Sequence, residues 1–157
     1  MPYDVFISYS HKDRKLLDEL AVHLSNLRKQ GIISNWFDGD ILPGSAWRTE
    51  LNNHLNQAHI ILLLVSADFI SSDFCYDVEM VRAVERDKAD EARVIPIILR
   101  PCDWAGTPFS EIQALPDEAK PVVTWPTHDE ALLNVVKGIR KAIKDLDEKK
   151  KGKASTP

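Results

Sequence analysis

The stretch HIILLLV, residues 59–65, decides the fold class, because every residue after His59 is apolar. A strand with one face in water alternates apolar and polar residues, whereas a strand buried on both faces is apolar throughout. Burial on both faces is typical of a strand in a parallel sheet that helices cover on each side. We therefore expect residues 59–65 to lie inside such a sheet.

Apolar runs and stretches of helical period alternate on both sides of this strand. The pattern predicts strands at 5–7, 34–38, 59–65, 93–99 and 120–125, and helices at 13–29, 46–57, 73–88, 109–114 and 128–147. Five alternating pairs predict right-handed crossovers and an α/β fold with a doubly wound, five-stranded parallel sheet. Pro96 lacks an amide N–H, so we expect imperfect pairing of the fourth strand there.

Composition predicts one globular domain followed by a tail. The chain has 157 residues, of which 44% are apolar and 28% charged, and both fractions are typical of folded proteins. Residues 148–153 include no apolar side chain. We therefore expect a domain at 1–147 and a disordered basic tail or linker at 148–157.

Charge and motif content exclude several classes of function. The net charge of −4 gives no basic footprint for nucleic acid. The longest apolar run, residues 60–65, is far shorter than the ~20 residues of a membrane span. Since no leader pattern precedes the first strand, we expect a cytoplasmic protein with no membrane partner. Cys75 and Cys102 form no CxxC pair and the five histidines form no HExxH, so no metal site is expected.

Well-known nucleotide motifs are also missing. No GxGxxG follows the first strand, and the chain contains no GxxxxGK[ST] or GxSxG. A phospho-acceptor receiver domain would need paired acids after the first strand, where this chain has Ser8, Tyr9 and Ser10. In doubly wound sheets, ligands bind outside the carboxyl ends of the strands. The loops at 8–14, 38–46 and 66–79 are therefore where a site is expected.

Three segments in these loops carry a family pattern. They read YDVFISYSHKD (residues 3–13), DGDILPGSAW (38–47) and LVSADFISSDFCYDVEM (64–80). In order and spacing they resemble the three signature boxes of the Toll/interleukin-1 receptor (TIR) domain, in its bacterial type. The resemblance extends from residue 3 to about residue 146. It implies a flavodoxin-like sheet with the strand order B-A-C-D-E, which is 2-1-3-4-5 along the chain.

The resemblance implies two classes of function. One is an enzyme that cleaves NAD at the nicotinamide–ribose bond, giving nicotinamide and ADP-ribose or a cyclic isomer. The other is a non-catalytic module that binds further TIR domains through the BB loop, residues 38–44. In the first class NAD is the substrate and no cofactor is needed, and self-association into a homo-oligomer or filament activates the enzyme in signalling or bacterial immunity. An N-glycosidase acting on another nucleoside or nucleotide is a third interpretation.

Matching the boxes assigns the catalytic carboxylate to Glu79. The substrate-binding candidates around it are Ser8, Tyr9, Ser10, Asp38, Leu42, Gly44, Trp47 and Cys75. Cys75 shares a helix face with Glu79 and stands where many enzymatic members carry an aromatic residue. Structural roles are the alternatives: an ion pair of Glu79 with Arg82 or Arg86, turn-capping hydroxyls, a packed tyrosine, a turn set by Pro43 and Gly44, and a core position for Trp47.

Overall fold

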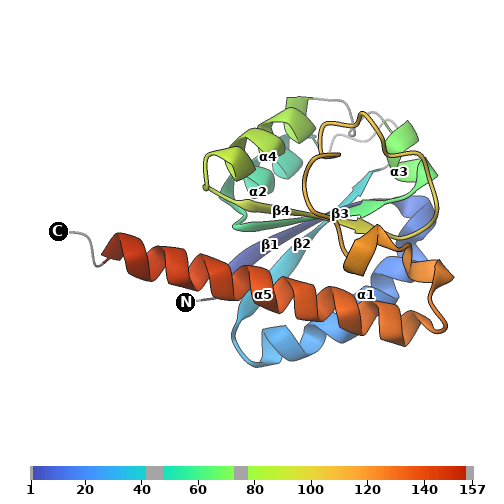
Figure 1. The fold of residues 1–157 in the computed structure, drawn as a ribbon. Helices are drawn as coiled ribbons and strands as arrows, with labels where there is room; N and C mark the ends of the chain where they lie inside the picture. Colours follow the sequence, from blue (N-terminus) through green and yellow to red (C-terminus); the bar gives the residue numbers. More distant parts are fainter. Residues whose placement is uncertain (1, 42–47, 73–77, 155–157) are drawn as a thin grey trace.

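The computed structural model describes residues 2–41, 48–72 and 78–154, and it contains a parallel sheet with helices on both faces (Figure 1). The strands are β1 (Tyr3–Ser10), β2 (Ile33–Ile41), β3 (Ile60–Val65) and β4 (Arg93–Ile98). The α-helices are α1 (Arg14–Lys29), α2 (Arg48–Gln57), α3 (Ala67–Ser71), α4 (Val78–Lys88) and α5 (His128–Ala154). Short 3-10 helices are η1 (His11–Asp13), η3 (Asp117–Ala119) and η4 (Val122–Thr124).

The sheet has the order β2-β1-β3-β4, and all its strand pairs are parallel. Every residue of β3 is buried, as its apolar sequence predicts. The α/β class and the order of the first four strands are therefore confirmed. Parallel pairing brings the carboxyl ends of β1, β3 and β4 to one edge of the sheet.

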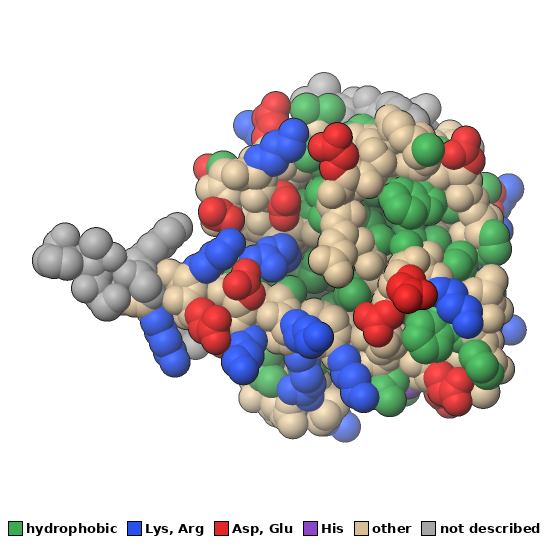
Figure 2. All heavy atoms as spheres, in the orientation of Figure 1, with side chains coloured by type: hydrophobic (Ala, Val, Ile, Leu, Met, Phe, Trp, Pro, Cys, Tyr) green, Lys and Arg blue, Asp and Glu red, His purple; other side chains and the backbone are tan. Residues whose placement is uncertain are grey.

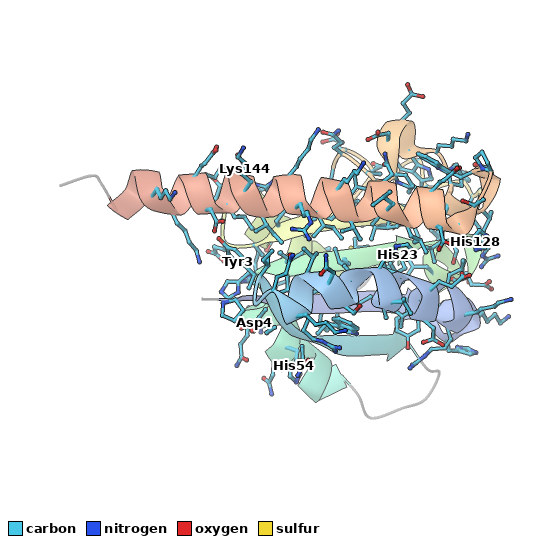
Figure 3. All side chains as sticks on the ribbon, turned by 90° about the horizontal axis from the view of Figure 1, so that it is seen from below. Tyr3, Asp4, His23, His54, His128 and Lys144 are labelled. Atoms are coloured by element: carbon cyan, nitrogen blue, oxygen red, sulfur yellow. The ribbon has the colours of Figure 1, made fainter. Side chains whose placement is uncertain are left out.

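Two apolar clusters fill the space between the sheet and its helices. Alternate residues of β1, such as Ile7 and Tyr9, face the cluster under α1 and α5. Phe6 faces the other cluster, under α2, α3 and α4. Near the start of α5, two side-chain pairs join it to α1: His23 with Asp129 and His128 with Glu19, at 3.0 and 3.1 Å (Figure 3).

The predicted fifth strand is wrong. Residues 120–125 form the 3-10 helix η4 and its flanks, and within the described residues the sheet has four strands. The Val123 amide donates to the carbonyl of Leu99, the residue after β4, at 3.1 Å. The place of a fifth strand is taken by Leu115, which forms a single bridge with Ile97. The helix predicted at 109–114 is also absent, since these residues form turns.

Outward backbone groups of β4 are bonded within the domain. The Val94 amide donates to Asp87 Oδ1 at 2.9 Å. The Ile98 amide donates to the Leu115 carbonyl at 2.8 Å. Pro96 also faces outward, because its carbonyl accepts from the Leu115 amide. Its missing N–H therefore costs the sheet no ladder bond, and β3 pairs with β4 without a shift in register, contrary to the imperfect pairing expected there.

Helix α5 continues to Ala154, so residues 148–154 are helical and not a disordered tail. Lys149 Nζ lies 3.2 Å from Asp90 Oδ1 and 3.7 Å from Asp145 Oδ2. The Tyr3 hydroxyl donates to Asp147 Oδ1 at 2.6 Å, and Lys150 Nζ lies over the Tyr3 ring. These contacts stabilise the polar end of the helix. Figure 2 shows Lys and Arg side chains gathered along α5. Within the described residues, no helix combines the length and apolar character that crossing a bilayer requires.

The bond between Tyr3 and Asp147 makes stability depend on alkaline pH. Burial and this bond raise the pKa of Tyr3 from 10.0 to about 12. A raised pKa favours the neutral phenol in the folded chain, so its contribution is complete below pH 10 and is lost as the pH rises toward 12. We expect the free energy of unfolding, measured in urea, to fall more between pH 9.5 and 12 for the wild type than for Tyr3→Phe. Equal slopes for the two proteins would contradict this.

Candidate functional site

Charged side chains meet where β1, β3 and β4 end. Asp13 closes the 3-10 turn η1 that follows β1, Ser66 and Asp68 follow β3, and Arg100 follows β4. The four residues are far apart in the sequence. They come together because parallel strands present their carboxyl ends at the same edge.

Arg100 links two carboxylates at this edge. Its Nε donates to Asp13 Oδ1 at 3.0 Å, and its Nη2 donates to Asp68 Oδ2 at 2.5 Å. The Ser66 hydroxyl donates to the other oxygen of Asp13. Lys12 Nζ lies 3.7 Å from Asp68 Oδ1. We call Asp13, Ser66, Asp68 and Arg100 the rim network.

Hydrogen bonds within the rim network compensate the burial of its charged groups. The side chain of Asp13 is 2% exposed, so its carboxylate depends on Arg100 and Ser66 for the hydrogen bonds that water would supply. The hydrogen bond from Arg100 lowers the pKa of Asp68. Burial alone would lower the pKa of Arg100, but its bonds to Asp68 and Asp13 outweigh burial and raise it. The ion pair of Asp68 with Arg100 is therefore present over the physiological range.

Ser8 is a buried hydroxyl without a partner. Side chains alternate along a strand, so Ser8 shares with Phe6 the face of β1 that α2 and α4 cover. It is 0% exposed, and its Oγ has no hydrogen-bond partner within the described residues. Buried hydroxyls are nearly always bonded, so Ser8 Oγ is a candidate for a hydrogen bond with a ligand. Ser10, on the same face, accepts from the Lys12 amide at 3.3 Å and caps η1.

Tyr9 points the opposite way from Ser8. Its ring is 0% exposed and belongs to the cluster under α1 and α5. Its hydroxyl accepts from Arg14 Nη1 at 2.7 Å, and the Arg14 guanidinium lies 5.9 Å from the ring centre. The structure therefore does not bring Tyr9 together with the side of the sheet where α4 packs.

Glu79 is the second residue of α4, whose next residue, Met80, is buried in the same cluster as Phe6. Asp38 lies in β2 opposite Ile7 of β1. The structure thus brings the backbone of Glu79 to the face of the sheet on which Ser8 lies. The predicted residues Leu42, Gly44, Trp47 and Cys75 lie outside the described residues.

The sequence reasoning missed the rim network as a unit. Asp13, Ser66 and Asp68 stand in the quoted boxes but received no role, and Arg100 was not considered. The sequence does place a charged residue soon after each of these buried strands. A charge that is partly buried at the end of a strand needs a partner of opposite charge, and this could have indicated the network. Within the described residues no group of His, Cys, Asp and Glu could hold a metal ion.

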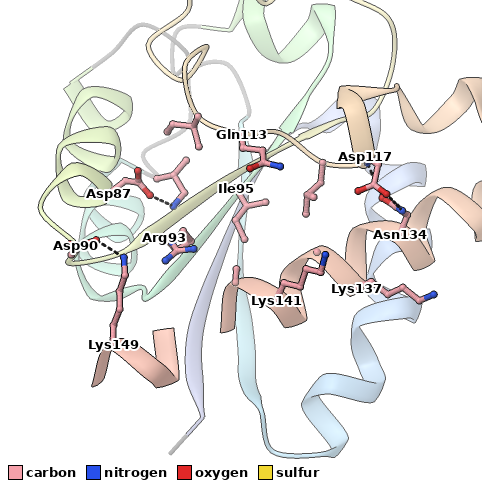
Figure 4. A pocket seen from close by; sticks show the side chains of 15 residues that line it. Asp87, Asp90, Arg93, Ile95, Gln113, Asp117, Asn134, Lys137, Lys141 and Lys149 are labelled. Carbon is pink, nitrogen blue, oxygen red and sulfur yellow. Dashed lines mark hydrogen bonds and ion pairs between the residues drawn. The ribbon is translucent and has the colours of Figure 1, made fainter. Parts of the chain in front are cut away.

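Two cavities lie away from this edge. One, of about 570 Å³, lies beside the first half of β4, between α4 and α5 (Figure 4). Its charged groups hold these elements together: Lys149 pairs with Asp90, and Arg93 Nη2 lies 2.5 Å from Asp145 Oδ2. The other, of about 360 Å³, is lined by the beginning of β1, by β2 and by the end of α2. Neither is formed by the carboxyl ends of the strands.

Comparison with known proteins shows the family and the fold. A family model described as TIR domain matches residues 5–121. The chain belongs to the TIR domain family. The uncharacterized protein y4lF of Sinorhizobium fredii is 52% identical over 138 residues, which cover 88% of this chain and 43% of that protein. This relative agrees with the bacterial type expected from the sequence.

More distant relatives carry the same domain. Toll-like receptor 4 of Pinctada imbricata is 25% identical over 133 residues, which cover 82% of this chain and 14% of the receptor. The crystal structure of the TIR domain of the Toll-related receptor TRR-2 from Hydra magnipapillata has a TM-score of 0.54 at 21% identity, covering 88% of this chain and 98% of that one. It shows that the fold is shared. The chain spans less than half the length of the curated relatives it matches.

The burial of Asp13 predicts a large effect of its removal. Asp13→Ala leaves Arg100 and Ser66 without their shared acceptor, and we expect a loss of about 3 kcal/mol in the free energy of unfolding. Asp18→Ala is the matched control, because Arg14 Nε lies 3.2 Å from Asp18 Oδ1 but the Asp18 side chain is 63% exposed. For the control we expect less than about 1 kcal/mol. Similar losses in urea titrations of the two variants would show that the rim network does not depend on burial.

Proposed function

We propose that this TIR domain hydrolyses NAD at the nicotinamide–ribose bond, with Glu79 as the catalytic carboxylate. The products are nicotinamide and ADP-ribose or its cyclic isomer. NAD is the substrate in this reaction, and the proposal includes no further cofactor. Activity would depend on self-association with other TIR domains through the BB loop, predicted at residues 38–44, of which residues 38–41 belong to the end of β2, in a signalling or defence response.

The chemistry requires little from the protein. Nicotinamide leaves NAD as a neutral molecule, so its departure needs no general acid. Positive charge develops on the ribose in an oxocarbenium-like transition state, as in glycoside cleavage. One fixed carboxylate beside the ribose stabilises that charge, and it does so more strongly where water is excluded. Glu79 would supply this carboxylate, and water or a base nitrogen would then meet the ribosyl centre.

The unpartnered hydroxyl of Ser8 carries the proposal. It lies at the carboxyl end of β1, where ligands of doubly wound sheets bind, and on the side of the sheet that α4 covers. Glu79 belongs to the first turn of that helix. A ribose hydroxyl or a carboxamide on the side of the sheet that α4 covers would satisfy Ser8. On the opposite face the Tyr9 hydroxyl accepts a hydrogen bond from Arg14, so Tyr9 is a structural residue in this proposal.

Replacement of Glu79 tests the catalytic role. We expect Glu79→Ala to lower nicotinamide release from NAD by at least about 100-fold, because the developing charge loses its stabilising carboxylate. Glu85→Ala is the control, since Glu85 is an exposed glutamate of the same helix. Release is measured at high protein concentration and with the chain clustered on beads, so that assembly does not limit the rate.

Three outcomes would contradict the proposal in different ways. No release from the clustered wild type would favour a non-catalytic module that binds other TIR domains. Release that Glu79→Ala leaves unchanged would remove Glu79 from the mechanism. Cleavage of free nucleosides without cleavage of NAD would indicate an N-glycosidase with another substrate.

Replacement of Ser8 separates a ligand contact from a structural role. Because its hydroxyl has no partner, Ser8→Ala should leave the free energy of unfolding unchanged or raise it. Nicotinamide release should nevertheless fall about 3- to 10-fold, the effect of one lost hydrogen bond to the substrate. Ser10→Ala should instead lower stability by about 0.5–1 kcal/mol, because it removes the cap of η1. Full activity of Ser8→Ala would contradict a contact with substrate.

A further inference from the structure

The His59 side chain bonds the chain at the beginning of β1. Its Nδ1 accepts from the Asp4 amide at 2.9 Å, and the His59 amide donates to the Asp4 carbonyl at 2.9 Å. The ring thus supplies an acceptor just before the first paired residues of β1 and β3, Val5 and Ile60. A ring nitrogen that accepts a hydrogen bond carries no proton, so this bond requires neutral His59 with its hydrogen on Nε2.

The same ring contacts Tyr3, the residue that holds the end of α5. The Tyr3 and His59 rings meet edge to face, with their centres 5.6 Å apart. The Tyr3 hydroxyl donates to Asp147 at 2.6 Å, and Lys150 Nζ lies 4.4 Å from the centre of the Tyr3 ring. We call the contacts of Tyr3 with His59, Asp147 and Lys150 the Tyr3 junction. Through this junction His59 connects the sheet to the end of α5.

Charged groups from the surrounding elements act on His59. Burial lowers its pKa, and the cations Lys150 of α5 and Arg86 of α4 lower it further, whereas Asp4 of β1 acts in the opposite direction. From β4, the Arg93 amide donates to the His59 carbonyl, and the Arg93 guanidinium is paired with an aspartate of α5. The fold therefore favours the neutral imidazole, which is the form that the bond from Asp4 requires.

We propose that His59 is an acid-sensitive switch that controls how the end of α5 is held against the sheet. A proton on Nδ1 turns this nitrogen into a donor that faces the Asp4 N–H, so the bond is lost. The proton also places a second positive charge close to Lys150. The other tie of this end, from Lys149 to Asp90, is an exposed ion pair and contributes little. Acidification therefore loosens residues 147–151, and this does not depend on the proposed function.

The start of α5 responds to acid in the opposite direction. His128 Nδ1 lies 3.1 Å from Glu19 Oε2, and His23 Nε2 lies 3.0 Å from Asp129 Oδ1. Protonation of either histidine turns its contact into an ion pair. Figure 3 shows both histidines near the start of α5, far along the helix from Tyr3. Acid therefore loosens the end of the helix while its start stays attached.

The variant His59→Asn tests the switch, because asparagine Oδ1 can accept from the Asp4 amide but does not titrate. Backbone NMR order parameters of residues 148–151 should agree between the variant and the wild type at about pH 7.5. At about pH 4.5 they should fall toward the flexible range, below about 0.6, in the wild type only. The control His128→Asn should keep the wild-type response. An equal fall in the wild type and His59→Asn would overturn the proposal.

Stability should follow the same titration. Because the pKa of His59 is lowered in the folded chain, its contribution to the free energy of unfolding is complete above pH 6.5 and is lost as the pH falls below that value. The free energy of unfolding in urea should therefore decrease more between about pH 7.5 and 4.5 for the wild type than for His59→Asn. Equal decreases would show that the His59 bond does not stabilise the fold.

The variant Lys150→Gln gives a reciprocal test from the side of α5. Lys150 lowers the pKa of His59, so removing its charge should raise the midpoint of the His59 titration, followed by NMR, by about 0.2–0.5 pH units. Lys151→Gln is the matched control, because Lys151 is the next residue of the helix and is also exposed. An unchanged midpoint in Lys150→Gln would overturn the coupling to α5. A neutral ring with its hydrogen on Nδ1, identified from nitrogen chemical shifts, would overturn the switch itself.

Discussion

Burial of the sheet on both faces confines polar chemistry to the ends of its strands. All residues of β3 are buried, and β1 is buried from Val5 to Ser10. A charged side chain along these strands would have no water and no partner, so its free energy cost would be several kcal/mol. The charges of this region therefore stand after the last strand residue, in the loops that follow β1, β3 and β4.

A charge placed there is still largely withdrawn from water. Asp13 is nearly as inaccessible as the core, and Arg100 and Ser66 replace its hydration. This sets it apart from pairs such as Arg14 with Asp18, in which both side chains are more than half exposed and solvent weakens the attraction. The rim network thus joins the three loops that follow β1, β3 and β4, although these loops are far apart in the sequence.

Local patterns predicted much of the fold. The run at 59–65 and the leucines of α1 specify their elements through their own sequence, so the fold class followed from local patterns, whereas the order of the four strands came from the resemblance to the TIR family. The strand predicted at 120–125 failed because pairing depends on the edge it would join, and Leu115 already occupies the edge of β4. Helix α5 extends past residue 147, where Tyr3 bonds Asp147 and Asp90 pairs with Lys149. Both partners are distant in the sequence, so the local pattern did not indicate this extension.

The candidate site was predictable in part. The boxes supplied Ser8, Tyr9 and Glu79 as candidates, but a strand places the side chains of Ser8 and Tyr9 on opposite faces. Alternation along β1 would have revealed this. Arg100 and Asp13 are 87 residues apart, and no local pattern connects them. Their pairing follows only from the parallel topology, which brings the two strand ends together.

The closed edge of β4 limits how copies of this chain can associate. The outward amides of β4 offer no free donor to a neighbouring strand. The Val94 amide donates to Asp87, the Ile98 amide donates to Leu115, and Pro96 has no amide N–H. The sheet therefore cannot grow across this flank into an intermolecular sheet. Any higher-order assembly that uses this side of the molecule has to be built from side-chain contacts of α4, α5 and the segment around Leu115, whose geometry single substitutions can tune without disturbing the backbone ladder.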